Sequence, residues 1–151
     1  MTVSGSGLPA AAPAARTMHL RVLSPARAAY DGQALSVILP AFDGEWGVLA
    51  NHAPMVAALA TGCLRLTRPD GGSESFAIRG GFAEVRDNTV TVLSPDCRGA
   101  AELSPESIAA ELGAAAPASA APADKAAAAS RQAWAKACRT VLSASAGKHQ
   151  A

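Results

Sequence analysis

Asp43 and Glu45 form a close acidic pair within the segment Asp43-Gly44-Glu45-Trp46-Gly47. Two neighbouring carboxylates can act as general acid and general base when their surroundings separate their pKa values. A small hydrolase built on this pair would also need a pocket and a side chain that orients the carboxylates, and the sequence shows neither. A solvated turn is therefore the better interpretation of the pair.

Other residue types that could carry chemistry lack the necessary spacing. The histidines are not spaced as metal ligands, and the cysteines lie far apart without a C-x-x-C motif (His19, His52, His149; Cys63, Cys97, Cys138). The sequence contains no phosphate-binding loop, no dinucleotide fingerprint and no G-x-S-x-G motif. We therefore expect no catalytic residue, no metal and no cofactor.

His52 has two interpretations. It lies in Asn51-His52-Ala53-Pro54, between two apolar runs. It could be a turn histidine that is hydrogen-bonded to nearby backbone, or an exposed contact residue on a loop. The residues alone leave both open.

Composition narrows the class of protein. The 151 residues include 13 Lys and Arg against 12 Asp and Glu, and a net charge of +1 predicts no nucleic-acid partner. Residues 46–64 contain no Lys, Arg, Asp or Glu, but Asn51, His52, Pro54 and Gly62 interrupt them, which favours strand–turn–strand over a membrane span. Free cysteines and the lack of a basic, apolar leader indicate a reducing compartment.

The chain divides by composition. We expect a disordered tail at 1–17, a β-sandwich domain at 18–96 and an alanine-rich helical region at 97–151. From Ala100 onward, 21 of 52 residues are alanine. Proline cannot continue a helix, so Pro117 and Pro122 should separate helices at about 104–116 and 124–146.

Apolar residues at every second position predict strands in the middle of the chain, as in Met18-His19-Leu20-Arg21-Val22 and at Leu35, Val37 and Leu39. Pro69-Asp70-Gly71-Gly72 and Asp87-Asn88 are typical of hairpin turns. Short strands with a turn about every ten residues indicate an antiparallel sandwich or flattened barrel.

Caps and spacing predict the helices. Ser104-Pro105-Glu106 supplies a hydroxyl cap, a proline at the first helical position and an acid in the first turn. The large residues of the second helix share one face, and Gly147 should end it (Trp134, Cys138, Val141 and Leu142). The remainder is mostly alanine, so we expect these helices to dock loosely or to wait for a partner.

The order and spacing of several segments resemble one family. They are Pro25, Gly32, Val37-Ile38-Leu39-Pro40, Asp43 to Leu49, His52-Ala53-Pro54, Leu59, Gly62, Ile78 to Val85 and Val90 to Leu93. Over about residues 18–96 the chain resembles the epsilon subunit of rotary F-type ATP synthases, called delta in mitochondria. The resemblance implies a mainly β fold with C-terminal α structure: a ten-strand flattened β-barrel or sandwich followed by a two-helix segment.

The resemblance also implies a non-catalytic role in ATP synthesis driven by proton transport. In this family the β domain binds the gamma subunit of the central stalk and rests on the rotor ring of c subunits. The implied ring contacts are the acidic loop and the nearby histidine (Asp43, Gly44, Glu45, Trp46, Gly47 and His52). Ser24 and Ala57 match positions near the gamma-facing surface.

The helical region departs from the family pattern. Some relatives bind ATP there through an acid followed three residues later by arginine and then alanine, whereas Asp124 is followed by Lys125 and four alanines. Nucleotide binding is therefore not expected. The second helix is basic, and we hypothesise that it restrains ATP hydrolysis by contacting the alpha and beta subunits (Arg131, Trp134, Lys136 and Arg139).

The expected location is the cytoplasmic face of the bacterial inner membrane, peripherally and only through the complex. A free-standing β-sandwich binding module with a helical appendage is the alternative interpretation. A rim of surface aromatics would favour that module, but Tyr30, Phe42 and Trp46 are few and dispersed.

Overall fold

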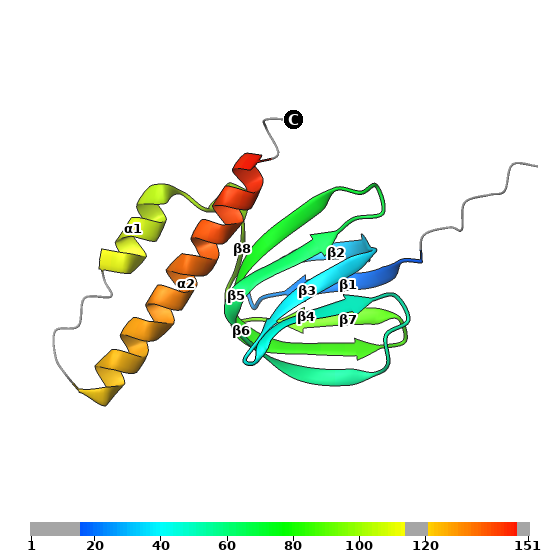
Figure 1. Cartoon of the computed structure of the whole chain (residues 1–151), viewed down its shortest axis with the longest axis horizontal. Coiled ribbons are helices and arrows are strands. Elements are labelled where there is room, and N and C mark those ends of the chain that lie inside the picture. The colour runs from blue at the N-terminus through cyan, green and yellow to red at the C-terminus, as the bar shows by residue number, and fades with distance from the viewer. Residues whose placement is uncertain (1–15, 114–120, 148–151) are drawn as a thin grey trace, which may run out of the picture.

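The structure is a computed structural model that describes residues 16–113 and 121–147. A β domain forms one body and two helices pack on one side of it (Figure 1). The strands are β1 (Met18–Leu23), β2 (Ala28–Ala34), β3 (Ser36–Ala41), β4 (Gly44–Leu49), β5 (Met55–Thr67), β6 (Ser73–Arg86), β7 (Thr89–Leu93) and β8 (Cys97–Gly99). The short 3-10 helix η1 (Ala100–Glu102) leads to α1 (Pro105–Gly113) and α2 (Pro122–Ala146).

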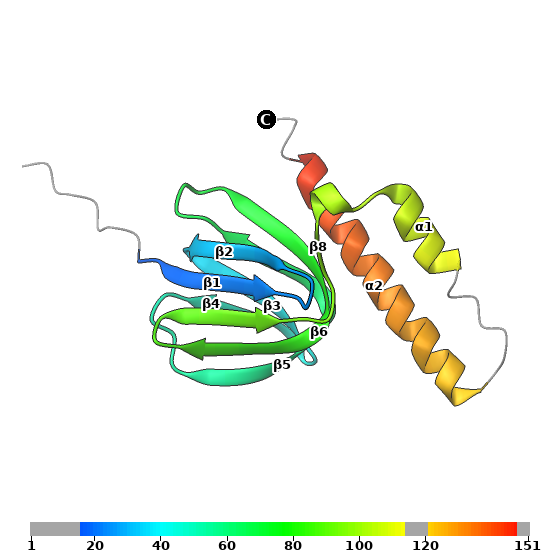
Figure 2. The same cartoon turned by 180° about the vertical axis from the view of Figure 1, so that it is seen from behind.

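The strands follow the order β2-β1-β7-β6-β5-β3-β4, and β8 pairs with β6. All of these pairs are antiparallel except β1 with β7, which are parallel. Figure 2 shows β1, β7, β6 and β5 from behind, lying side by side. This arrangement confirms the expected β-sandwich class.

The expectation of ten strands is wrong, because the described residues form eight. β5 and β6 are continuous strands of 13 and 14 residues, and each serves both layers of the sandwich. In β6, Phe76–Ile78 pair with β8, whereas Phe82–Arg86 pair with β7. Counting each half of these two strands separately would give the expected number.

The bend in β6 lies at Gly80 and Gly81, which have φ angles of 68° and 117°. Ile78 faces the core before the bend and Ala83 faces it after, so the alternation changes phase there. A Cβ at position 81 would lie 1.9 Å from the Leu93 carbonyl oxygen. Glycine is therefore required where β6 crosses between the layers.

The strand and turn predictions are confirmed in most details. Alternate residues of β1 are buried, and so are Val37 and Leu39 of β3, whereas Leu35 lies in the bend before β3 and is only half-buried. Asp87 and Asn88 have φ angles of 49° and 56°, and a two-residue hairpin turn of type I′ requires a positive φ at both of its central residues. The other predicted turn, Pro69-Asp70-Gly71-Gly72, joins β5 to β6.

The helices begin at Pro105 and Pro122. The Ser107 backbone N–H donates to Ser104 Oγ over 3.1 Å, which confirms the predicted cap of α1. Pro122 is the first residue of α2, and Gly147 caps its end. Of the helix predicted at 104–116, the last three residues lie outside the described part of the chain, as does most of the predicted tail at 1–17.

The expectation of loose docking is wrong for α2. Trp134, Cys138 and Val141 are buried against the β domain, and Leu142 is partly buried with them. None of the described helices combines the length and hydropathy needed to cross a membrane.

Candidate functional site

The β3–β4 hairpin presents an exposed tip. Phe42 and Asp43 connect the two strands, and the Phe42 side chain is 80% exposed. Gly44 has a φ of 134°, which glycine adopts without a steric penalty. The tight turn thus places the Phe42 ring and the Asp43 carboxylate next to each other in the chain, at the end of the β3–β4 hairpin.

The two acids of the predicted ring contact differ. Arg65 Nη2 lies 2.6 Å from Glu45 Oε2, so an arginine of β5 already offsets the Glu45 charge. Asp43 makes no ion pair with the described residues. The negative charge that this tip offers to another molecule therefore belongs mainly to Asp43.

His52 is held by its neighbours. Its Nδ1 lies 2.8 Å from the Ala53 carbonyl oxygen, and its ring meets Trp46 edge to face at a centroid distance of 5.6 Å. The backbone bond predicted by the turn interpretation is confirmed.

The half-buried ring of Trp46 also lines a hollow of about 390 Å³ beside the hairpin tip, together with Phe42, Asp43 and Met55.

A second surface crosses the outer face of β5, β6 and β7. We call Val56, Ala58, Phe82 and Leu93 the apolar stripe. Ala58 pairs with Phe82, and Phe82 pairs with Leu93, so their side chains lie in one row. Val56, Phe82 and Leu93 are 70%, 60% and 53% exposed, which is unusual for large apolar side chains gathered on one face.

Of the two residues predicted to face gamma, Ser24 borders this stripe, because Leu23 pairs with Leu93 and Ser24 follows Leu23 directly. Ala57 lies between Val56 and Ala58 on β5 but pairs with the buried Ala83, so its half-buried side chain faces the opposite side of the strand, where it lines the hollow beside Trp46. Sequence reasoning missed the stripe itself, although an apolar residue at the outward position of each alternating strand was the signal that could have revealed it.

The four predicted regulatory residues of α2 separate into two groups. Lys136 and Arg139 are exposed and Arg131 is half-exposed, whereas Trp134 is fully buried. The Trp134 ring faces the guanidinium groups of Arg79 and Arg98. In this conformation Trp134 serves the docking of α2 and is not available to a partner.

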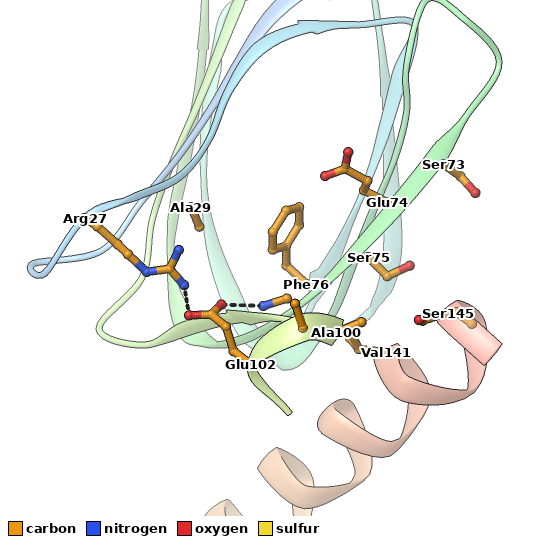
Figure 3. A pocket seen from close by; sticks show the side chains of 13 residues that line it. Arg27, Ala29, Ser73, Glu74, Ser75, Phe76, Ala100, Glu102, Val141 and Ser145 are labelled. Carbon is orange, nitrogen blue, oxygen red and sulfur yellow. Dashed lines mark hydrogen bonds and ion pairs between the residues drawn. The ribbon is translucent and has the colours of Figure 1, made fainter. Parts of the chain in front are cut away.

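A groove of about 430 Å³ runs between β6, η1 and the end of α2 (Figure 3). Phe76 forms part of its wall, and Arg27 and Glu102 form an ion pair at its rim. Burial raises the pKa of Glu102, but hydrogen bonds from the Gly99 N–H and Arg27 outweigh this effect and lower it. Glu74 is likewise paired with Arg68, 2.6 Å away.

The groove's charged side chains thus pair with protein groups and leave no free charge to select an ionic ligand. Among residues 16–113 and 121–147, no group of three or more potential ligands could hold a metal ion. The candidate binding surfaces of the described residues are therefore the hairpin tip, the apolar stripe and the docked α2.

The comparisons with known proteins agree with this architecture. Residues 17–99 match the family model described as "ATP synthase, Delta/Epsilon chain, beta-sandwich domain". The chain belongs to this ATP synthase family. The matched segment ends at the last residue of β8, so α1 and α2 lie outside it.

Relatives in the family include the ATP synthase epsilon chain of Dichelobacter nodosus, 40% identical over 87 residues that make up 58% of this chain and 61% of that one. The ATP synthase epsilon chain of Hyphomonas neptunium is 39% identical over 98 residues, or 65% of this chain and 73% of that one. The match to the Dichelobacter chain spans less than two thirds of its length.

Solved structures share the fold. A chain of the Euglena gracilis mitochondrial ATP synthase structure that contains OSCP, F1 and the c-ring aligns with a TM-score of 0.73 at 22% identity, covering 93% of this chain and 87% of that one. A chain from the central stalk and c-ring of the Tetrahymena thermophila enzyme aligns with a TM-score of 0.65 at 18% identity, covering 83% of this chain and 96% of that one. These alignments extend the likeness to the helices.

Proposed function

We propose that this chain is the non-catalytic epsilon subunit of the central stalk in a proton-translocating F-type ATP synthase. It would couple rotation of the c-ring to ATP synthesis in the catalytic head. The observation that carries the proposal is the family match over the whole β domain, residues 17–99. The proposed location is the cytoplasmic face of a bacterial inner membrane, reached only through the complex, and the family match and the free cysteines support it.

The apolar stripe is the proposed gamma-binding surface, with Ser24 at its border, whereas Ala57 would meet gamma only beside the hollow on the other face of β5. Its large apolar side chains are solvent-exposed in the isolated chain. Covering a Phe or Leu side chain of this kind stabilises a complex by about 1.5–3 kcal/mol before association costs are counted. A row of exposed apolar side chains across three strands, with the exposed Glu84 opposite Val56, suits a lasting contact with a partner.

The hairpin tip is the proposed c-ring contact, with Phe42 and Asp43 in front and Trp46, Gly47 and His52 behind. A carboxylate and an exposed aromatic ring suit a partner loop that carries basic and apolar side chains. Glu45 contributes less than its position suggests, because Arg65 already neutralises it.

The helical region is the proposed restraint on ATP hydrolysis. Lys136 and Arg139 project from α2 into solvent, where they could meet acidic surface on the alpha and beta subunits. The full chain should inhibit hydrolysis by a head that lacks its own small subunit, and a chain ending at residue 103 should bind without inhibiting. Equal hydrolysis with both chains would refute the restraint and leave the coupling role intact.

Coupling itself can be tested in membrane vesicles stripped of the small subunit. Adding the chain, together with the matching head, should restore ATP-driven proton pumping. Pumping that is equally efficient without the chain would contradict the proposed role, since hydrolysis would then be coupled by other subunits alone.

A further inference from the structure

The turn between β4 and β5 passes through a residue with a left-handed backbone. Asn51 has a φ of 61°, and the backbone N–H of the next residue, His52, donates to the Leu49 carbonyl oxygen over 3.2 Å. This conformation is costly for most residues other than glycine, and asparagine is among those that tolerate it best. The backbone at Asn51 sets the position of the histidine that follows, so whatever holds Asn51 also holds His52.

The Asn88 side chain holds this turn from a different hairpin. Its Oδ1 accepts a hydrogen bond from the Asn51 backbone N–H over 2.8 Å, and its Nδ2 donates to the Thr17 carbonyl oxygen over 2.8 Å. The Asn88 carbonyl oxygen also accepts from the His19 N–H over 3.0 Å. One residue of the β6–β7 turn therefore joins the β4–β5 turn, 37 positions away, to the residue before β1, 71 positions away.

Asparagine meets every requirement of position 88. The partners fix the orientation of its amide, because a backbone N–H can only donate and a carbonyl oxygen can only accept. The backbone φ of Asn88 is 56°, which asparagine tolerates. Aspartate would supply the acceptor without the donor, and glycine would adopt the backbone angle without any side chain. These differences allow the two side-chain bonds to be tested separately.

The His52 ring has one nitrogen left for another molecule. Its Nδ1 lies 2.8 Å from the Ala53 carbonyl oxygen, which can only accept, so Nδ1 carries the proton of the neutral imidazole. Nε2 makes no hydrogen bond within residues 16–113 and 121–147. The edge-to-face contact with Trp46 restrains the plane of the ring. The lone pair of Nε2 is thus available as an acceptor at this turn.

We propose that Asn88 is a positioning residue for the c-ring contact. Its bond to the Asn51 N–H fixes the β4–β5 turn, so that His52 keeps its proton on Nδ1 and offers the Nε2 lone pair to the ring. The fitting partner group is a hydrogen-bond donor, such as a lysine, arginine or amide side chain. The identity of the partner rests on the proposed function, whereas the effect of Asn88 on His52 is a property of the isolated chain.

Nitrogen NMR of the isolated full chain, at a pH that keeps imidazole neutral, tests the positioning step. The His52 signals of the unmodified chain should show the proton on Nδ1. Asn88→Gly keeps the left-handed backbone but removes the amide, so its His52 should exchange between both tautomers. An unchanged His52 spectrum in this variant would overturn the proposal.

Asp87→Gly is the matched control for that experiment. It makes the same kind of change one residue earlier in the turn, where φ is 49° and the side chain pairs with Arg86 on the surface. Because the Asp87 side chain makes no bond to the β4–β5 turn, the His52 spectrum should stay as in the unmodified chain. A shift equal to that of Asn88→Gly would assign the effect to the hairpin backbone and overturn the role of the amide.

Asn88→Asp separates the two side-chain bonds. Its carboxylate still accepts from the Asn51 N–H but cannot donate to the Thr17 carbonyl oxygen. The variant should keep the proton of His52 on Nδ1 and bind rings within about twofold of the unmodified chain, since the bond to Asn51 becomes charge-assisted. Losses as large as those of Asn88→Gly would overturn the assignment to the Asn51 bond.

Co-sedimentation of the assembled stalk with detergent-solubilised c-rings tests the consequence. Asn88→Gly should bind rings about twofold to tenfold more weakly, the range expected when one intermolecular hydrogen bond is lost. His52→Phe should lose the same amount, and combining the two changes should add nothing, because both remove the same bond. Additive losses, or unchanged ring binding in Asn88→Gly, would overturn the proposal.

Gamma binding distinguishes a local change from a failure to fold. Phe82 and Leu93 pair at the opposite end of the β6–β7 hairpin from Asn88, so Asn88→Gly should bind gamma as the unmodified chain does. Failure of the unmodified stalk to bind rings would refute the proposed function, and the NMR result would still decide whether Asn88 positions His52.

Discussion

Glu45 on β4 and Arg65 on β5 form an ion pair across the intervening strand β3, with 2.6 Å between carboxylate and guanidinium. Both side chains are about half-exposed. The pair offsets the charge of Glu45, whereas Asp43 has no ion-pair partner among the described residues.

Asp43→Asn should therefore weaken association with a c-ring more than Glu45→Gln does. An exposed charge contact contributes about 0.2–1 kcal/mol, so the loss should be up to about fivefold and should disappear at high salt. Co-sedimentation of the assembled stalk with detergent-solubilised rings, across a salt series, measures it. A larger effect for Glu45→Gln would show that the partner displaces Arg65.

Replacing a residue of the apolar stripe should weaken binding to gamma. Phe82→Ala removes a large, 60% exposed ring from the centre of the row, and we expect a loss of about tenfold or more in affinity. Phe42→Ala is the matched control, because it removes a phenyl ring that is even more exposed, at 80%, from the hairpin tip. Equal losses for the two variants would contradict separate gamma and ring surfaces.

Gly81→Ala should destabilise the β domain by about 1–3 kcal/mol or more, because the new Cβ would collide with the Leu93 carbonyl oxygen and φ is positive. Urea unfolding followed by circular dichroism measures the change. In Gly47→Ala the new methyl group meets nothing within 4 Å, so it serves as the control. Equal midpoints for the two variants would refute the account of the bend in β6.

The Cys138 thiol should report on the docking of α2. Burial raises its pKa to about 11, although Arg98 and Arg79 oppose the shift. Only the thiolate reacts with iodoacetamide, so alkylation should be slow at neutral pH and accelerate as the pH rises toward that pKa. Mass spectrometry of the modified full chain follows the reaction.

Trp134→Leu should speed Cys138 alkylation at neutral pH, because the undocked thiol returns toward its ordinary pKa. Cys97, which is buried in the sandwich with a pKa raised to about 12, should stay slow in both forms. Rapid modification of Cys138 in the unmodified chain would contradict the docked arrangement.

Local signals in the sequence predicted local structure well. The cap at Ser104, the turn at Asp87-Asn88 and the buried face of α2 each depend on a few neighbouring residues, and all are confirmed. The change of phase at Gly80 and Gly81 was not predictable in this way, because it depends on which strands pair with each half of β6.

The candidate surfaces were only partly predictable for a related reason. The acidic segment is contiguous, so its residues stood out, but its ion pair joins residues 20 positions apart. The apolar stripe is assembled from different strands, and the contacts of Trp134 with Arg79 and Arg98 join a helix to two strands. Their members look ordinary one at a time, and only tertiary contacts bring them together.

Binding of the full chain to a catalytic head from the same organism, stripped of its own small subunit, tests the central claim most directly. We expect saturable association that requires gamma and is weakened by Phe82→Ala. Absence of binding to the matched head, or binding that is the same without gamma, would contradict the assignment to the central stalk.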